Sequence, residues 1–176
     1  MATINHSDVE NKSFLNPIAF KFVIQKMPHV NYFCTSANIP EMTLGQIDTV
    51  DNTFIKLPTP GDKLTFGLLT LRFRVDEDMQ NYQEVYDWMI GLGYPDNFGQ
   101  RQDIQNTGSR RTGDVYSDAS LILTTGSYKA NIECKFIDLY PVALAMPEFD
   151  IEQTTVNPMI GDATFAYRKY EFTKIK

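Results

Sequence analysis

The sequence is poor in the side chains on which most enzymes and metal sites depend. Its 176 residues include two histidines, two cysteines and one tryptophan. His6 and His29 are too few and too far apart in sequence for a zinc site. No window approaches the roughly 18 uninterrupted apolar residues of a membrane-spanning helix. Because no cationic region is followed by an apolar run at the N-terminus, we expect no signal peptide.

Catalytic motifs that can be recognised from residue spacing are also missing. The sequence has no G-x-S-x-G elbow, no H-E-x-x-H helix, no P-loop and no G-x-G-x-x-G turn after a strand. The acidic run 76–78 lacks the alternating ligands and glycine bend of a calcium loop. Cys34 and Cys134 lie in apolar strand patterns, which favours buried free thiols over a disulfide or a metal site. We therefore predict no enzymatic activity and no cofactor.

Basic residues are outnumbered by acidic ones. The chain has 16 Lys and Arg against 22 Asp and Glu, which gives a net charge of −6. Because phosphate contacts need clustered Lys and Arg, this balance argues against a general nucleic-acid-binding protein. An apolar content of 43% is typical of a folded chain, and the length fits one domain. We predict a flexible polar arm over 1–13 and a single domain over 14–176.

Alternation of apolar and polar residues recurs along the chain and predicts β-strands. We place strands at 18–25, 30–35, 64–75, 119–124, 128–139 and 163–173, with a short return at 149–151. A phase slip near Asp138 predicts a bulge or a strand end there, Pro141 predicts a strand end, and Arg168 with Lys169 predicts a further bulge. Since the 64–75 strand has one apolar and one polar face, an antiparallel sheet is favoured.

The period changes to helical spacing after residue 75. Asp76, Glu77 and Asp78 put carboxylates at the expected helix start, where free N–H groups favour negative charge. Apolar residues then recur at helical spacing until glycines at 91 and 93 and a proline at 95. We predict one flanking α-helix over about 76–90 whose apolar stripe packs on the core. Together the patterns predict a mainly β fold, an antiparallel β-sandwich or partly closed barrel.

Residues 37–61 carry more apolar side chains than a solvated loop needs. A turn signal at Asp51 and Asn52 separates β-type residues, and prolines stand at both ends. We predict a protruding hairpin over about 39–61 that forms a partner surface; the alternative is that its apolar side chains fold back on the core. The candidate interface residues are Ile39, Met42, Leu44, Ile47, Val50, Phe54, Ile55 and Leu57.

Residues 96–114 are rich in Gly, Asn and Gln and show no period. Arg101, Arg110 and Arg111 make this segment locally basic on an acidic protein. This segment is expected to bind phosphate or an acidic neighbouring subunit. The alternative is a solvated mobile loop. These three arginines complete the set of candidate interface residues.

Six short motifs follow one another in a distinctive order. They are FKFVI at 20–24, NIP at 38–40, PTPGD at 58–62, FRVDED at 73–78, VYDWM at 85–89 and DLYP at 138–141. The most specific is the strand-to-helix junction at 73–78 with the Trp-Met that follows it. Over roughly 16–174 the chain resembles the tail-tube superfamily of contractile-tailed bacteriophages, and within it the tail completion proteins, or tube terminators.

The resemblance implies two packed sheets with a flanking helix and an extended hairpin. It also implies a hexameric ring whose sheets join into an inner barrel, which caps the tail tube at its head-proximal end in a virion assembled in the host cytoplasm. Its implied partners are the tube protein, sheath terminator and neck proteins, and a tape measure protein. DNA would cross the lumen without specific binding, and no membrane is involved. Ring closure has a physical reason, because it removes free sheet edges.

Two other interpretations stay open at this stage. A major tube protein or a baseplate-proximal tube component would share the fold but polymerise instead of stopping at a ring. A monomeric β-sandwich that binds a ligand would have a small apolar pocket and no concentration-dependent assembly.

Overall fold

The computed structural model describes residues 14–49, 57–93, 95, 99, 115–146, 148–152 and 157–175. These residues contain nine strands and two helices. The strands are β1 (Phe20–Ile24), β2 (Cys34–Ala37), β3 (Met42–Thr49), β4 (Leu57–Phe66), β5 (Leu69–Arg74), β6 (Ser117–Thr124), β7 (Ala130–Ala145), β8 (Ile160–Ala166) and β9 (Lys169–Lys174), and the helices are α1 (Pro28–Phe33) and α2 (Gln80–Gly93).

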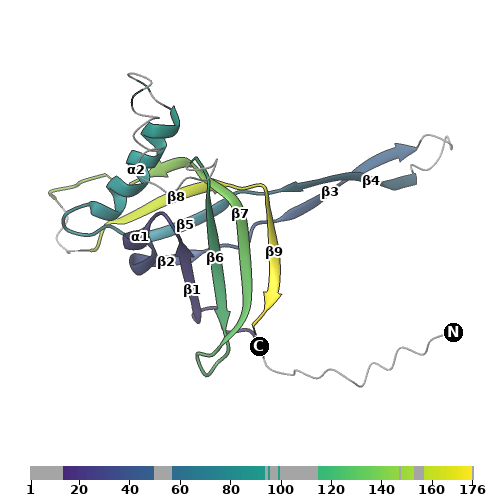
Figure 1. Cartoon of the computed structure of the whole chain (residues 1–176), viewed down its shortest axis with the longest axis horizontal. Coiled ribbons are helices and arrows are strands. Elements are labelled where there is room, and N and C mark those ends of the chain that lie inside the picture. The colour runs from purple at the N-terminus through teal and green to yellow at the C-terminus, as the bar shows by residue number, and fades with distance from the viewer. Residues whose placement is uncertain are drawn as a thin grey trace.

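Two antiparallel sheets share the long strand β7 (Figure 1). Sheet A consists of β1, β6, β7 and β9, with β7 between β6 and β9. Sheet B consists of the C-terminal part of β7 with β8, β5 and β2. The mainly β, antiparallel fold predicted from the alternation is confirmed.

The chain passes between the sheets at two neighbouring points. Asp138 of β7 has a φ of 56°, and Arg168, between β8 and β9, donates its backbone N–H to Ile137 O at 3.0 Å. The 163–173 strand is therefore two strands, one in each sheet, and the bulge predicted at Arg168 and Lys169 is the crossover. The strand end predicted at Pro141 is wrong. Within the described residues β7 pairs only with β8 beyond Leu139, an edge position that tolerates a proline.

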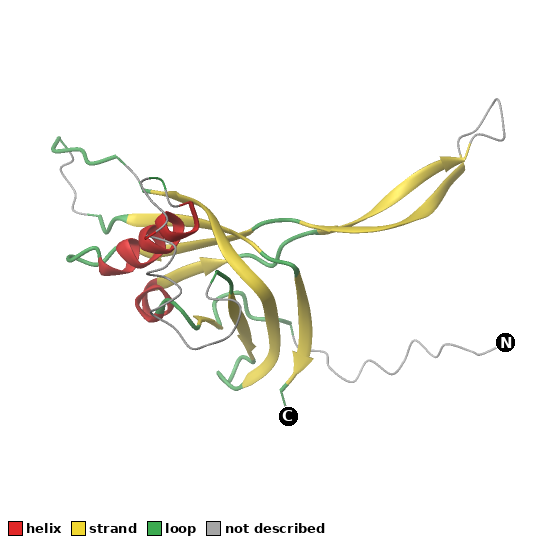
Figure 2. Cartoon of the chain, turned by 45° about the horizontal axis from the view of Figure 1, so that its top comes forward, coloured by secondary structure: helices red, strands yellow, loops and turns green. Residues whose placement is uncertain are grey.

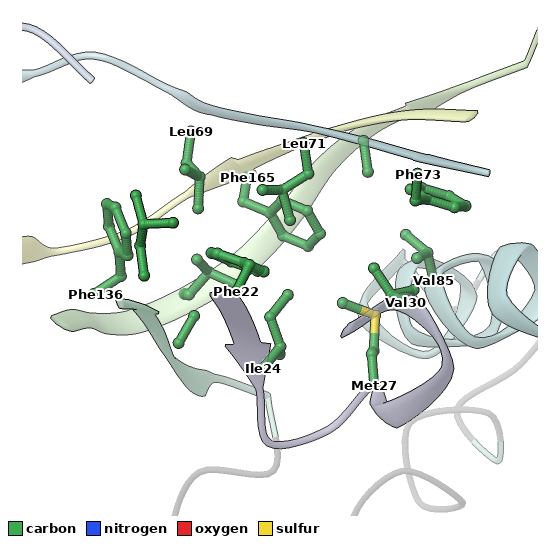
Figure 3. Close-up of a cluster of buried hydrophobic side chains, with 14 of the residues drawn as sticks. Phe22, Ile24, Met27, Val30, Leu69, Leu71, Phe73, Val85, Phe136 and Phe165 are labelled. Carbon is green, nitrogen blue, oxygen red and sulfur yellow. The ribbon is translucent and has the colours of Figure 1, made fainter. Parts of the chain in front are cut away.

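The core lies between the two sheets and is closed at one end by the helices (Figure 3). Phe22 and Ile24 of β1 point toward Leu71 and Phe165 of sheet B, and all four are at most 1% exposed. Burying each of these side chains contributes roughly 1.5–3 kcal/mol. Trp88 of α2 reaches Phe165, with ring centroids 6.3 Å apart. The apolar stripe predicted for the helix does pack on the core through Val85 and Trp88, although Tyr86 beside them is half exposed.

Helix α2 begins at Gln80 and ends at Gly93, whereas the sequence pattern predicted 76–90. The acidic run lies before the helix because Asp76 and Asn81 bond reciprocally. Asp76 Oδ1 accepts from the backbone N–H of Asn81 at 3.3 Å, and Asn81 Oδ1 accepts from that of Asp76 at 3.4 Å. Asn81 Nδ2 also donates to Arg74 O at 2.7 Å, so a fully buried amide ties the end of β5 to the helix.

The strand predicted at 30–35 is wrong for residues 30–33, which lie in α1, whereas residues 34 and 35 begin β2. A proline at the first helical position is favourable, since its missing N–H is not needed there. The Asn31 side chain satisfies both backbone groups of Ile24, as a neighbouring strand would. Its Oδ1 accepts from the Ile24 N–H at 2.6 Å, and its Nδ2 donates to the Ile24 carbonyl at 2.8 Å. Val30, fully buried, seals the core below the helix.

A two-stranded arm of β3 and β4 projects from the domain (Figure 2). The predicted protruding hairpin is present but shifted, since residues 64–66, predicted to begin the next strand, belong to β4. The chain turns at Gly67, whose N–H donates to Glu41 O at 2.9 Å, and β5 starts at Leu69. The short strand predicted at 149–151 is absent, and Phe149 and Ile151 are exposed instead.

Candidate assembly interface

Four of the predicted interface residues can be examined on the arm and its root. Ile39, Met42, Leu44 and Ile47 are 41%, 56%, 50% and 57% exposed. These side chains do not fold back on the core, so that alternative is wrong for them. Leu57 begins β4. The other candidates lie outside the described residues: Val50, Phe54, Ile55, Arg101, Arg110 and Arg111.

The arm carries a further exposed apolar residue that the sequence did not reveal. Leu64 of β4 pairs with Leu44 of β3 and is 55% exposed. Its alternation with neighbouring residues indicated a central strand, which hid its place on the arm. Farther out, Thr59 Oγ1 of β4 donates to Ile47 O of β3 at 2.9 Å. Both strands of the arm therefore carry exposed apolar side chains, Leu44 and Ile47 on β3 and Leu64 on β4.

An aromatic cluster fixes the root of the arm to the domain. The Phe66 ring lies 5.3 Å from Tyr170 of β9 and 6.1 Å from Tyr167, and Phe136 of β7 lies 5.1 Å from Tyr167. Offset and edge-to-face contacts of this kind contribute roughly 0.5–1.5 kcal/mol each beyond their burial. The arm therefore leaves the domain in a defined direction.

Two glycines let the strands of the arm approach closely. The register shifts between Leu44 and Gln46, beside Gly45. A Cβ atom placed on Gly61 would lie 2.6 Å from the carbonyl oxygen of Gly45, closer than real Cβ atoms approach backbone. Only glycine fits at position 61 without separating the strands.

One edge of sheet A is the strand β9, which pairs only with β7 among the described residues. Since the N–H of Ile175 donates to Asn131 O, the alternation of an antiparallel ladder directs the backbone groups of Tyr170, Phe172 and Lys174 away from β7. The Phe172 side chain is 56% exposed on the same edge. This edge is open to a further strand.

The opposite edge of sheet A is β1. The same reasoning directs the backbone groups of Phe20, Phe22 and Ile24 away from β6. Ile24 is already bonded to Asn31, and Phe22 is buried, which leaves the half-buried Phe20 as the accessible part. The open part of this edge is therefore its N-terminal end.

A groove of about 440 Å³ lies beside that end, between β1 and β2. Its lining is largely apolar and includes Phe20, Ile39 and Leu123. Leu15 and Ile18 continue the apolar surface at 59% and 78% exposed. Residues 14–17 were assigned no role from the sequence, although Phe14 and Leu15 directly after the polar arm were a usable signal.

Several polar features have structural explanations. Both cysteines are free thiols, with Cys134 buried as predicted and Cys34 only half-buried, and burial raises the pKa of each to about 11. His29 of α1 lies 2.5 Å from Glu84 of α2, and this hydrogen bond raises the pKa of the imidazole. The described residues contain no group of three or more His, Cys, Asp or Glu that could hold a metal, and none of their helices is long and apolar enough to cross a membrane.

Comparison with known proteins rests on structure alone, since neither a family model nor a curated protein matches the sequence. The tube-terminating cap of the anti-feeding prophage superposes with a TM-score of 0.65 at 15% identity, covering 99% of this chain and 100% of that one. The chain has a tail-tube-like fold. Two further similar structures come from an extracellular contractile injection system called PVC. Its sheath-tube complex gives a TM-score of 0.63 at 15% identity over 97% and 99% of the two chains. Its sheath/tube terminator gives 0.62 at 16% identity over 93% and 99%.

Proposed function

We propose that this chain is a structural tube terminator of a contractile injection system or phage-like tail. Copies form a closed ring, a homo-hexamer by resemblance, which caps the tube at its head-proximal end. The observation that carries the proposal is the likeness to the anti-feeding prophage cap, which covers 99% of this chain and 100% of that one. The sheath terminator, neck and tape measure proteins are its expected partners, and no membrane is involved.

The two edges of sheet A support a ring. Neighbouring strands of the sheet are antiparallel throughout, so β9 of one copy would also run antiparallel to β1 of a copy related by rotation. Backbone groups open on both edges belong to residues whose side chains lie on the core face, so joining the edges aligns like faces. Because the edges differ, the contact is heterologous and closes by rotation.

The arm supports the same arrangement. It leaves the domain on the side of β9, away from β1 (Figures 1 and 2). A neighbour that joins its β1 edge to β9 would therefore also receive the arm. The apolar groove between β1 and β2 of that neighbour is the surface on which Leu44, Ile47 and Leu64 would lose their exposure to water.

Paired substitutions on the arm test this assembly. Leu44→Asp with Ile47→Asp should leave the fold unchanged by circular dichroism and abolish the ring in multi-angle light scattering at tens of micromolar. Phe149→Asp with Ile151→Asp, at exposed apolar residues away from the arm, is the matched control and should keep the ring. A ring that survives the arm substitutions would refute the role of the arm.

Electron microscopy of the unmodified protein tests the subtype. A terminator should give isolated rings, whereas long tubes would assign the chain to the tube protein instead. A stable monomer that holds a small molecule would favour the ligand-binding module.

A further inference from the structure

The C-terminal part of β7 is an outer strand of sheet B (Figure 1). Its residues 140–145 pair with β8 on one side. The pairing of β6 with β7 ends at Leu139, so no described residue pairs with the other side of 140–145. Alternate residues of such an edge direct their backbone groups outward. The edge therefore offers donors and acceptors that another extended backbone can satisfy.

The exposed side chains of this edge are apolar. Val142, Ala143 and Ala145 are exposed, and no charged residue occurs within 139–147. Proteins usually block a free edge with charges, prolines or bulges. Here the charge is missing, and Pro141 and the register shift beside it lie at one end. Residues 142–145 are left as an uncharged site for strand pairing.

An apolar pocket of about 470 Å³ lies at the Pro141 end of the edge. Its lining comes from β7, from the residues before β6 and from the C-terminal part of α2, and it includes Tyr140, Tyr116, Met89 and Leu92. The rings of Tyr116 and Tyr140 meet edge to face with their centroids 5.7 Å apart, and both side chains are exposed. This pocket would receive a bulky apolar or aromatic side chain.

The other end of the edge is acidic. Glu148, Asp150 and Glu152 follow the strand and are exposed, and none of the three forms an ion pair with a described residue. All strand pairs of sheet B are antiparallel. An added strand with the same orientation would begin beside these carboxylates and end at the pocket. Its first residues would then be Lys or Arg.

We infer that the β7 edge of sheet B binds an extended segment of a partner protein by strand addition. The segment carries Lys or Arg at its N-terminal end, uncharged residues in the middle and a bulky apolar side chain at its C-terminal end. Backbone hydrogen bonds supply the affinity, and the carboxylates and the pocket fix the direction. The inference goes beyond the proposed function, because ring closure uses the two edges of sheet A.

A designed peptide tests the strand addition. The probe is Lys-Lys-Thr-Val-Thr-Val-Thr-Phe with an N-terminal fluorophore and a C-terminal amide, and its binding to the full chain is measured by anisotropy. Two further forms are N-methylated, one at both valines and the other at the last two threonines. Because alternate amides of a strand face opposite sides, one form loses its bonds to β7 while the other keeps them.

Two substitutions test the location of the site. Val142→Lys places a charge on the edge, and Tyr116→Ala removes one wall of the pocket. Tyr128→Lys, at an exposed residue before the opposite end of β7, adds the same charge and is the matched control. Circular dichroism checks the fold of each variant, and light scattering records the assembly state.

The unmodified protein should bind the peptide. One methylated form and the Val142→Lys variant should each weaken binding by about tenfold or more, since two or more backbone bonds are lost. Tyr116→Ala should weaken binding by about threefold, while the other methylated form and Tyr128→Lys should leave it within about twofold.

Three outcomes would overturn the inference. They are no binding at hundreds of micromolar, equal effects of the two methylated forms, and equal binding by Val142→Lys and Tyr128→Lys. A doubled assembly mass that Val142→Lys halves would assign the edge to a second copy and would also overturn it. Peptide binding by a protein that forms no ring would overturn the proposed function alone.

Discussion

The buried amide of Asn81 is expected to stabilise the junction between β5 and α2. Asn81→Ala removes the bonds to Arg74 O and to the N–H of Asp76, and leaves the Arg74 carbonyl without its side-chain donor. Each lost bond costs about 0.5–1.5 kcal/mol, and an unsatisfied buried group costs about 1–3 kcal/mol. Because the contributions overlap, we expect a loss of about 2–4 kcal/mol in the free energy of unfolding.

Urea denaturation at a fixed protein concentration measures this loss. Gln83→Ala, at an exposed position of the same helix, is the control and should change stability by less than about 0.5 kcal/mol. Asn81→Asp keeps the acceptor but not the donor to Arg74 and should cost at least as much as alanine, since a buried charge is added. If Asn81→Ala cost no more than Gln83→Ala, the proposed role of the amide network would be refuted.

Three further predictions concern the arm, the helices and the thiols. Gly61→Ala should disturb the arm, because its Cβ would meet the Gly45 carbonyl, and amide exchange of β3 and β4 should accelerate; unchanged exchange would contradict this. The raised pKa of His29 should stabilise the fold fully below pH about 6.5, and this contribution should disappear as pH rises through the folded pKa. His29→Gln should flatten that part of the pH dependence of the melting temperature, and an unaltered profile would count against the Glu84 pair. Cys134, buried with a pKa of about 11, should react slowly with a thiol reagent at pH 8 in the folded protein, so rapid labelling would be inconsistent with the structure.

The sequence was most informative where one face of an element is buried. Phe22 and Ile24 on β1 and Leu69, Leu71 and Phe73 on β5 alternate with residues that are less buried, so both strands were predicted. The free thiols and the flanking helix followed from the same patterns. The spacing of apolar residues identifies such elements, because a buried face recurs at every second residue in a strand and at every third to fourth residue in a helix.

The errors came from specific hydrogen bonds and strand ends that a periodic pattern does not encode. The crossover at Arg168 depends on its bond to Ile137, and the start of α2 depends on the reciprocal bonds of Asp76 and Asn81. Alternation also continued through Leu64, so the end of the arm could not be located. The candidate interface has two sides, the arm and the β1–β2 groove. The sequence predicted the apolar residues of the arm but not the groove.

The central claim is that copies of this chain join through different edges of sheet A into a closed ring. The most direct test is the mass of the native assembly in solution, measured at tens of micromolar and imaged by electron microscopy. A discrete assembly of six copies with an open centre is the predicted result. A protein that stays monomeric at that concentration would contradict the account.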